Sequence, residues 1–264
     1  MRNIVSIVFV VLLLTGCEKI VDLKYKDNPS RIIIEGNITD QAGPYLVKLT
    51  KSVKLTETGA YPTVDNAVVT ISDNIGNTET LTSQGSGVYK TTTLSGAPGR
   101  TYTLTVQAEG QTYTAQSTMQ PRVAFDSIRV EKNVFTGETE YNIVPVYTDP
   151  DVKGNNYRFT VSLNNKLINQ HFIQNDEVKN GVVNAARLEI SLDDDLKFKA
   201  GDLISVAMQC VDAKVALYYK TLALMGDSGP GGGTTPNNPP TNISNGALGI
   251  FSAHTIETKN VVLQ

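Results

Sequence analysis

The residue with the most specific chemistry in this sequence is Cys17, in the stretch Leu14-Thr15-Gly16-Cys17. A cysteine can form a disulfide, act as a reactive thiol, ligate a metal or carry a covalent group. Arg2 and the apolar run from Ile4 to Leu14 precede it. That run is about half the roughly 20 residues that a membrane-spanning helix needs. A basic start, a short apolar middle and small residues before a cut are typical of a secretory signal.

The order of a leucine, a small residue, glycine and cysteine resembles the bacterial lipobox. In that pathway the thiol receives a diacylglyceryl group, the chain is cut before the cysteine, and the new amino terminus is acylated. We therefore expect a signal peptide at residues 1–16, lipidation of Cys17 and a tether over residues 17–30. The alternative is an ordinary signal peptide with a chance cysteine, but the motif falls where the apolar run ends. Several acyl chains on one residue suffice for stable anchoring without a membrane span.

The other cysteine, Cys210, is left alone if Cys17 is lipidated. Neither an intrachain disulfide nor a cysteine-rich metal site is then possible. Cys210 lies in the apolar stretch "LISVAMQCVDA", which predicts a small core residue.

Two acidic stretches offer oxygen ligands. Asp149, Asp151, Gly154 and Asn155 lie close together in "TDPDVKGNN", and paired hard oxygens can bind Ca²⁺. A Pro/Gly turn between strands explains the same residues and is favoured, because the further acidic ligands of an EF-hand are missing. Asp193–Asp195 form a second acidic run, which we interpret as a solvated turn. We therefore predict no metal and no other cofactor.

Histidine and tyrosine supply the remaining candidates for chemistry or binding. His171 and His254 are the two histidines, and neither has a nucleophile or an acid at motif spacing. An acid–base role is the alternative to an isolated side chain. Tyr218 and Tyr219 could form an aromatic platform for sugar, although a stripe at helical spacing favours a core position. Asp126-Ser127-Ile128 fits a three-residue O-glycosylation pattern at Ser127, and the alternative is a strand-opening Asp-Ser.

Composition limits the class of partner. The formal net charge is −3, and loss of residues 1–16 lowers it to −4 because Arg2 is the only charged residue removed. Mild acidity argues against nucleic acid or anionic lipid as a partner. Frequent Thr, Val, Ile and Tyr indicate a β-rich protein.

The elements expected before residue 121 are short strands separated by Gly/Pro turns. In "TYTLTV", Tyr102, Leu104 and Val106 alternate with threonines, which predicts one buried and one wet face. Regular spacing of such strands predicts an immunoglobulin-like β-sandwich over residues 31–120. The Cys…Trp…Cys signature of antibody domains is absent, since the chain has no tryptophan.

A second β-rich, sandwich-like domain is predicted over residues 121–264. After Asp212, a predicted N-cap, apolar residues fall at helical spacing and predict one short helix at about 213–225, ended by Gly226. Residues 227–244 form a Gly/Pro/Asn loop that we expect to be a surface excursion within the second domain. The closing stretch "ALGIFSAHTIETKNVVLQ" predicts an alternating pair of strands. The fold class is therefore all-β.

Several stretches together resemble a known family. They are "CEKIVDL", "IIIEGNITDQAGPYLVKLTKSV", "AVVTISDNIGNTETLT", "GVYKTTTLSGAPGRTYTLTVQAEGQTYTAQSTM", "YTDPDVKGNNYRF" and "NPPTNISNGALGIFSA". They are similar to the Bacteroidota lipoproteins of the domain of unknown function 4249 family, over essentially the whole mature chain. The resemblance implies an outer-membrane lipoprotein, often encoded beside a TonB-dependent receptor, and no catalytic residues. Related sequences often carry "GALGYF", where this chain has Ile250 before Phe251.

These observations predict a non-catalytic, lipid-anchored binding or accessory subunit of a TonB-dependent nutrient uptake system. Its ligand would be a small molecule or a glycan of unknown identity, and Tyr218, Tyr219 and Phe251 are the candidate ligand or partner surface. A structural or adhesive envelope protein that uses the Ig-like domain as a spacer is the alternative. A hydrolase is the least supported reading.

Overall fold

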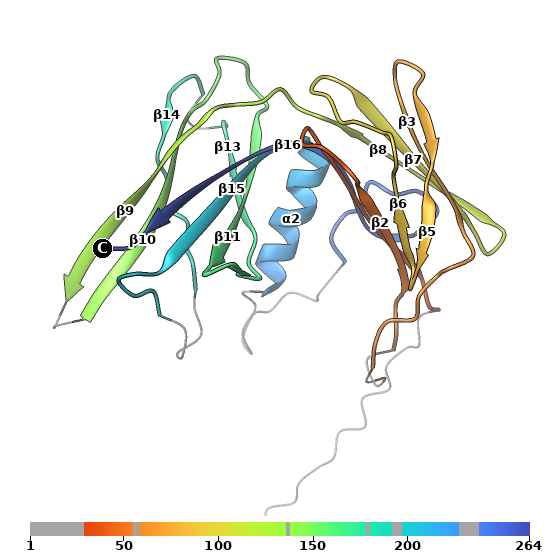
Figure 1. Ribbon diagram of the computed structural model, residues 1–264, viewed down its shortest axis with the longest axis horizontal. Coiled ribbons are helices and arrows are strands. Elements are labelled where there is room, and N and C mark those ends of the chain that lie inside the picture. The colour runs from red at the N-terminus through yellow and green to blue at the C-terminus, as the bar shows by residue number, and fades with distance from the viewer. Residues whose placement is uncertain are drawn as a thin grey trace, which may run out of the picture.

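The computed structural model describes residues 29–54, 57, 59–135, 138–177, 180–191, 197–226 and 238–264. The described residues form strands and one helix, α2, arranged as two packed β-sandwiches (Figure 1). The elements are β1 (Ile32–Thr39), β2 (Leu46–Lys51), β3 (Val68–Asp73), β4 (Thr78–Thr80), β5 (Thr82–Gly85), β6 (Val88–Lys90), β7 (Thr101–Ala108), β8 (Gln111–Thr118), β9 (Phe125–Phe135), β10 (Glu138–Thr148), β11 (Asn156–Leu163), β12 (Lys166–Leu167), β13 (Phe172–Asn175), β14 (Val183–Asn184), β15 (Leu203–Val211), α2 (Ala213–Gly226) and β16 (Leu248–Val262). The all-β fold class with one helix is confirmed.

One large sheet runs through both sandwiches. Its order is β12-β11-β15-β16-β1-β2-β6-β5, with β13 also paired to β11. The first half of β16 pairs in parallel with β1, and its second half pairs antiparallel with β15. A four-stranded sheet, β4-β3-β7-β8, and a three-stranded sheet, β14-β10-β9, complete the two sandwiches.

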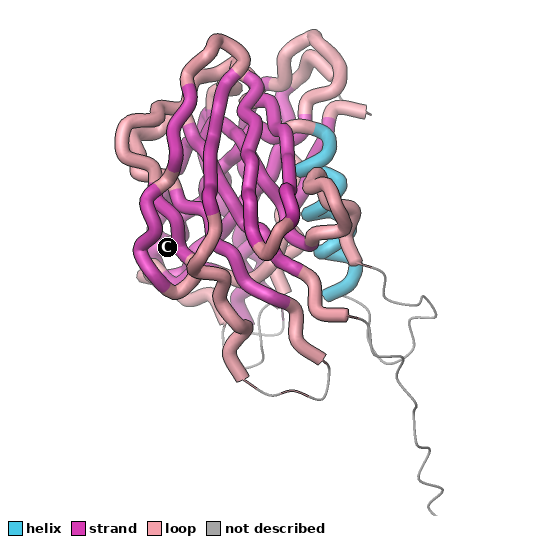
Figure 2. The backbone as a smooth tube through the Cα atoms, turned by 90° about the vertical axis from the view of Figure 1, so that its right-hand side faces the viewer, coloured by secondary structure: helices cyan, strands magenta, loops and turns pink. Residues whose placement is uncertain are grey.

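The N-terminal sandwich is built from strands that alternate buried and exposed residues. Tyr102, Leu104 and Val106 of β7 are at most 1% exposed, as their alternation with threonine predicts. They pack in one apolar cluster with side chains of β1 and β2, such as Ile34 and Leu49. Figure 2 looks onto this half of the molecule and shows its strands beside the helix.

The C-terminal sandwich has its own aromatic core. Phe125, Tyr147, Tyr157 and Phe159 are each at most 1% exposed and belong to one apolar cluster. The rings of Tyr147 and Tyr157 lie 4.5 Å apart between centroids. Cys210 is buried in the same cluster, as expected for a small core residue.

The C-terminal segment differs from the expectation in two ways. It forms the single strand β16 rather than a pair of strands. It also does not belong to the second sandwich alone, because Phe251 and Ala253 lie in the N-terminal core. A boundary at residue 121 therefore does not separate two independent sheets. Parallel pairing of β1 with a strand more than 200 residues later leaves no local signal in the sequence.

The expected loop at residues 227–244 is only partly covered, since residues 227–237 lie outside the described residues. Its later part is attached to the N-terminal sandwich rather than to the second domain. Ile243 forms a bridge with Ala115 and is buried. The side-chain amide of Asn242 donates to the Gln116 and Phe251 carbonyl oxygens at 3.0 and 2.7 Å.

Helix α2 begins and ends as the sequence predicts. Oδ1 of Asp212 accepts hydrogen bonds from the backbone N–H of Lys214 and Val215, both at 3.0 Å, which confirms the N-cap. Oδ2 of Asp212 accepts from Ser117 Oγ at 2.5 Å and ties the helix start to β8. The helix lies under the arch formed by the two sandwiches and covers the outer face of β11, β13 and β16 (Figure 1). Among the described residues, no helix is long and apolar enough to cross a membrane.

Candidate functional site

A cluster of polar and aromatic side chains lies between helix α2 and the large sheet, with Tyr219 at its centre. The Cζ atom of Arg158 lies 3.9 Å from the centroid of the Tyr219 ring, in the geometry of a cation–π contact. The ring of His171 lies 5.2 Å from the same ring, centroid to centroid. Nη1 of Arg158 donates to Oε1 of Gln209 at 2.8 Å. The helix thus converts an outer sheet face into a semi-buried site.

Two polar atoms of this cluster have no hydrogen-bond partner among the described residues. Nε of Arg158 and Nδ1 of His171 are both buried and unpaired. No carboxylate in the described part of the chain forms an ion pair with Arg158. Burial lowers the pKa of Arg158. Burial, and then the nearby Arg158 charge, lower the pKa of His171, so its imidazole is neutral at pH 7.

His254 lies in β16 and is 4% exposed. Burial, followed by the Arg158 charge, lowers its pKa to about 4. Its Nδ1 lies 2.9 Å from Oγ of Ser252, the spacing of a nucleophile and its base. Ser252 is 1% exposed, so a substrate cannot reach this pair in this conformation. Both histidines therefore experience the Arg158 charge, although they are far apart in the sequence.

A cleft of about 980 Å³ opens beside the cluster. Such a volume lies within the range of roughly 300–1,000 Å³ typical of ligand sites. Its walls come from β13 and the chain before it, from the extended chain after β14, and from the end of α2. The lining residues are Asn169, Gln170, His171, Phe172, Ile173, Gln174, Ala186, Arg187, Leu188, Glu189, Ser191, Leu222, Ala223 and Met225.

Two glutamines cross between the walls of the cleft. The side-chain amide of Gln170 donates to the carbonyl oxygen of Ser191, and Oε1 of Gln170 accepts from the Ser191 N–H at 3.0 Å. Nε2 of Gln174 donates to the Ala186 carbonyl oxygen at 3.2 Å. These bridges fix the separation of the two walls.

The acidic turn at Asp149 to Asn155 is held by protein donors. Asp149 accepts hydrogen bonds from the Tyr157 hydroxyl and, at 3.1 Å, from the Gly181 N–H. Asp176 accepts from the N–H groups of Gly154 and Asn155 at 2.7 and 3.0 Å. The described residues contain no group of three or more acidic, His or Cys side chains that could hold a metal ion. The second acidic run, Asp193–Asp195, lies outside the described residues.

The structure places the other candidate residues in different environments. Tyr218 packs edge-on to Tyr219 at 5.2 Å, is half-buried, and lies in the apolar contact between α2 and the sheet. Burial raises the pKa of Tyr218 to about 12. Phe251 is fully buried in the N-terminal core, so its expected role in a ligand or partner surface is wrong. Ser127 is exposed on β9, and Cys17 lies outside the described residues.

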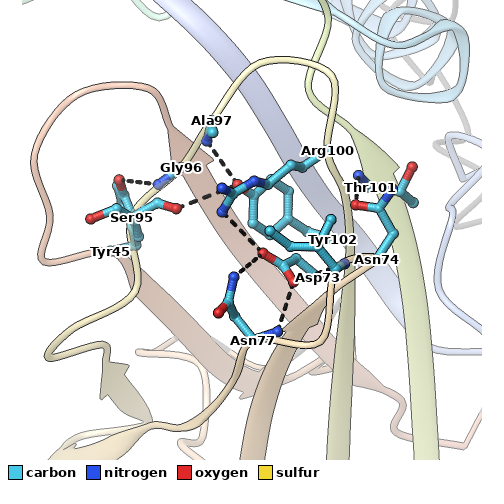
Figure 3. Close-up of polar contacts among 11 residues, drawn as sticks. Tyr45, Asp73, Asn74, Asn77, Ser95, Gly96, Ala97, Arg100, Thr101 and Tyr102 are labelled. Carbon is cyan, nitrogen blue, oxygen red and sulfur yellow. Dashed lines mark hydrogen bonds and ion pairs between the residues drawn. The ribbon is translucent and has the colours of Figure 1, made fainter.

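A second polar cluster closes one end of the N-terminal sandwich (Figure 3). Oδ2 of Asp73 accepts from Nη1 of Arg100 at 3.1 Å and from Nδ2 of Asn77 at 2.7 Å. A cavity of about 320 Å³ lies beside it and is lined in part by Arg100 and Glu79. Glu79 accepts from the backbone N–H of Leu94 at 2.6 Å. The two carboxylates hold turns together, so we assign this cluster a structural role.

Sequence reasoning missed Arg158, Gln170, Gln174 and Gln209. In "NYRFTVSL", Arg158 alternates with Tyr157 and Phe159, and that pattern predicts a solvent-exposed Arg158. Only the helix, which is distant in sequence, buries it. The four-residue spacing of Gln170 and Gln174 in "QHFIQ" is the one local signal for the bridges.

The family model described as "Domain of unknown function (DUF4249)" matches residues 18–260. The chain belongs to the DUF4249 family. No curated protein matches this DUF4249 chain. One similar solved structure is a two fibronectin type-III domain segment from chicken tenascin, with 15% sequence identity, coverage of 71% of the DUF4249 chain and 93% of that chain, and a TM-score of 0.23.

Proposed function

We propose that this chain is a non-catalytic, lipid-anchored binding protein of the outer membrane that serves as an accessory subunit of a TonB-dependent uptake system. The observation that carries the binding role is the cleft of about 980 Å³, which is lined by His171, a residue whose buried Nδ1 has no hydrogen-bond partner among the described residues. Buried polar atoms normally have hydrogen-bond partners. An unpaired polar atom on a residue that lines an open cleft favours a ligand site at this place.

Support for the anchor comes from the sequence. Cys17 follows a lipobox-like motif at the end of a short apolar run. A lipid anchor confines a protein to one surface, where two partners gain a high effective concentration and even a weak contact is occupied. Family membership, together with the frequent occurrence of such lipoproteins beside receptors, supports the receptor as the partner.

A structural role in the envelope is the second candidate, and one observation favours it. Strand β16 pairs with both β1 and β15, so a continuous sheet holds the two sandwiches in a fixed relation. A rigid two-domain spacer needs such a connection. The binding role and the structural role predict different results when the cleft is filled: only the binding role predicts a loss of function.

Lipidation is tested by the Cys17→Ala variant. We expect metabolic labelling with a fatty-acid analogue to mark the native chain and to be lost in the variant, since the thiol is the acceptor. Cys210→Ala is the matched control and should keep the label. A label that persists in Cys17→Ala contradicts the anchor.

The uptake role is tested by crosslinking in intact cells and by growth on the substrate of the neighbouring receptor. We expect the native chain to crosslink to that receptor. Ala223→Trp, which fills the cleft, should impair growth, whereas Ala213→Trp, on the exposed start of the same helix, should not. Absence of a receptor crosslink together with normal growth of both strains overturns the proposal in favour of the structural role.

A further inference from the structure

We propose that the cleft binds an extended segment of a partner polypeptide, which adds as a new strand to the free edge of β13. The inference rests on the proposed binding role and adds the chemical class of the ligand. It depends on three features: the strand edges that form the cleft, the direction of their backbone groups, and the glutamine bridges.

The cleft lies where both sheets of the C-terminal sandwich end. Strand β13 pairs with β11 on one side, and no described strand pairs with its other side. Strand β14 is likewise the outer strand of the small sheet. The chain after β14 continues along β10, since the Leu188 N–H donates to the Ile143 carbonyl oxygen at 2.9 Å. The two long walls of the cleft are therefore backbone edges.

The register of β13 shows which backbone groups face the cleft. The Asp176 N–H donates to the Asn155 carbonyl oxygen at 3.3 Å, and the pairs Gln174–Tyr157 and Phe172–Phe159 continue this register. Antiparallel pairing alternates hydrogen-bonded and non-hydrogen-bonded residues. Phe172 and Gln174 thus direct their backbone groups toward β11. Ile173, between them, directs its N–H and C=O toward the cleft, as the edge of a sheet does when it accepts a peptide.

Gln170 already shows that these walls accept an amide group. Its side-chain amide pairs with both the N–H and the C=O of Ser191. A primary amide carries the same donor and acceptor as a peptide unit. At the Gln174 end, Nε2 donates to the Ala186 carbonyl oxygen, and Oε1 accepts from the Tyr147 hydroxyl at 3.0 Å. Between the bridges, no described strand pairs with the outer edge at Ile173, and no described residue is a hydrogen-bond partner of Nδ1 of His171.

The flanking side chains indicate the sequence of the peptide. Leu222, Ala223 and Met225 of α2 form an apolar wall on the outer side. On the other side, Nη2 of Arg187 and Oε2 of Glu189 form an exposed ion pair at 3.0 Å. Side chains of a strand alternate between its two faces. A segment with alternating apolar and polar residues fits both walls and supplies a backbone donor and acceptor for the strand edge.

The test uses the chain lacking only residues 1–17 and a displayed library of random ten-residue peptides. We expect enriched peptides with alternating apolar and polar residues. A synthetic copy should bind the native chain and Ala213→Trp equally and Ala223→Trp at least tenfold more weakly. Backbone N-methylation at alternate residues should weaken binding at least tenfold, while methylation at the intervening residues should not. Ala223→Leu replaces the tryptophan variant if circular dichroism shows that the latter is unfolded.

Three results overturn the inference. One is that no peptide is enriched over a parallel selection on the filled cleft. Another is that N-methylation at every position has the same effect, which excludes strand addition. The third is binding of a glycan array probe that the filled cleft abolishes, which assigns the cleft to sugar. In each case lipidation at Cys17 and crosslinking to the receptor are measured separately, so failure of this inference is distinct from failure of the proposed function.

Discussion

At the residue scale, buried charges in this protein fall into two groups. The Asp73 carboxylate is fully paired by hydrogen bonds from Ile75, Asn77 and Arg100. Arg158 is largely surrounded by protein, yet no described residue accepts a hydrogen bond from its Nε. A satisfied buried charge stabilises a turn, whereas an unsatisfied one has a cost that a ligand or water can offset. This contrast separates the structural cluster from the candidate site.

Replacing Asp73 by alanine should destabilise the N-terminal sandwich. Burial raises the pKa of Asp73, but the hydrogen bonds from Asn77 and Ile75 and the Arg100 charge outweigh it and leave the pKa below its usual value. We expect a loss of about 2 kcal/mol in the free energy of unfolding, measured by urea denaturation, because hydrogen bonds to a charged group are lost. Glu131→Ala removes the exposed pair with Arg129 and should cost about 0.5 kcal/mol or less. Equal effects of the two variants would contradict the structural role of Asp73.

His254 should make stability depend on pH. Its pKa is about 4 in the folded chain, mainly because of burial, against an ordinary value of 6.5. As the pH falls below 6.5, the unfolded chain binds the proton first, so stability that is present above pH 6.5 is lost progressively down to pH 4. The loss is at most about 3 kcal/mol. Urea denaturation at pH 7 and pH 4.5 should show a smaller drop for His254→Gln than for the native chain. An equal drop in the free energy of unfolding for both chains would show that other titratable groups determine the pH dependence of stability.

At the element scale, β16 depends on one glycine. Gly249 has a φ of +93°, and a Cβ atom there would lie 2.2 Å from the carbonyl oxygen of Ile34 in β1. Gly249 faces Ile34 in the second pair of the parallel register, which begins at Ile33 and Leu248. Only glycine allows both the left-handed backbone and the close approach.

Gly249→Ala should therefore cost about 3 kcal/mol or more in the free energy of unfolding, since the two strands must separate locally. Gly76→Ala is the matched control, because Gly76 has a φ of +98° but a Cβ atom added there would meet no atom within 4 Å. Gly76→Ala should lower the free energy of unfolding by only about 1 kcal/mol, because it introduces the strain of a left-handed backbone without a steric clash. Thermal denaturation of both variants measures the difference, and similar losses would show that the contact with Ile34 is easily relieved.

The sequence predicts the positions of strands and helices better than it predicts which of them pair or pack together. Alternation in β7 and helical spacing after Asp212 are local patterns, and both predictions are confirmed. The pairing of β1 with β16, and the cover that α2 gives to Arg158, depend on contacts between distant residues. Hydrophobic spacing carries no information on such contacts. For the same reason the sequence does not reveal that Phe251 belongs to the N-terminal core, since β1 and the strands around it lie far away along the chain.

At the scale of the whole molecule, the two sandwiches share one strand and should not fold independently. The fragment 29–120 lacks β16 and the segment that holds Ile243, both of which contribute to its core. We expect this fragment to show no cooperative urea transition. The same fragment joined by a short linker to residues 238–256 should recover one. A cooperative transition of the fragment alone would contradict a shared fold.

The direction of β1 and β16 has a mechanical consequence. Residues 33–39 of β1 pair in parallel with residues 248–254 of β16, and β2 holds the opposite edge of β1. A pull on the amino-terminal end of β1 against a grip on the far end of β16 loads the hydrogen bonds between these strands in shear. All paired residues then resist together, whereas a hairpin pulled at its open end yields one bond at a time. A chain tethered by its amino terminus and gripped through its C-terminal sandwich would transmit tension along this seam without unravelling.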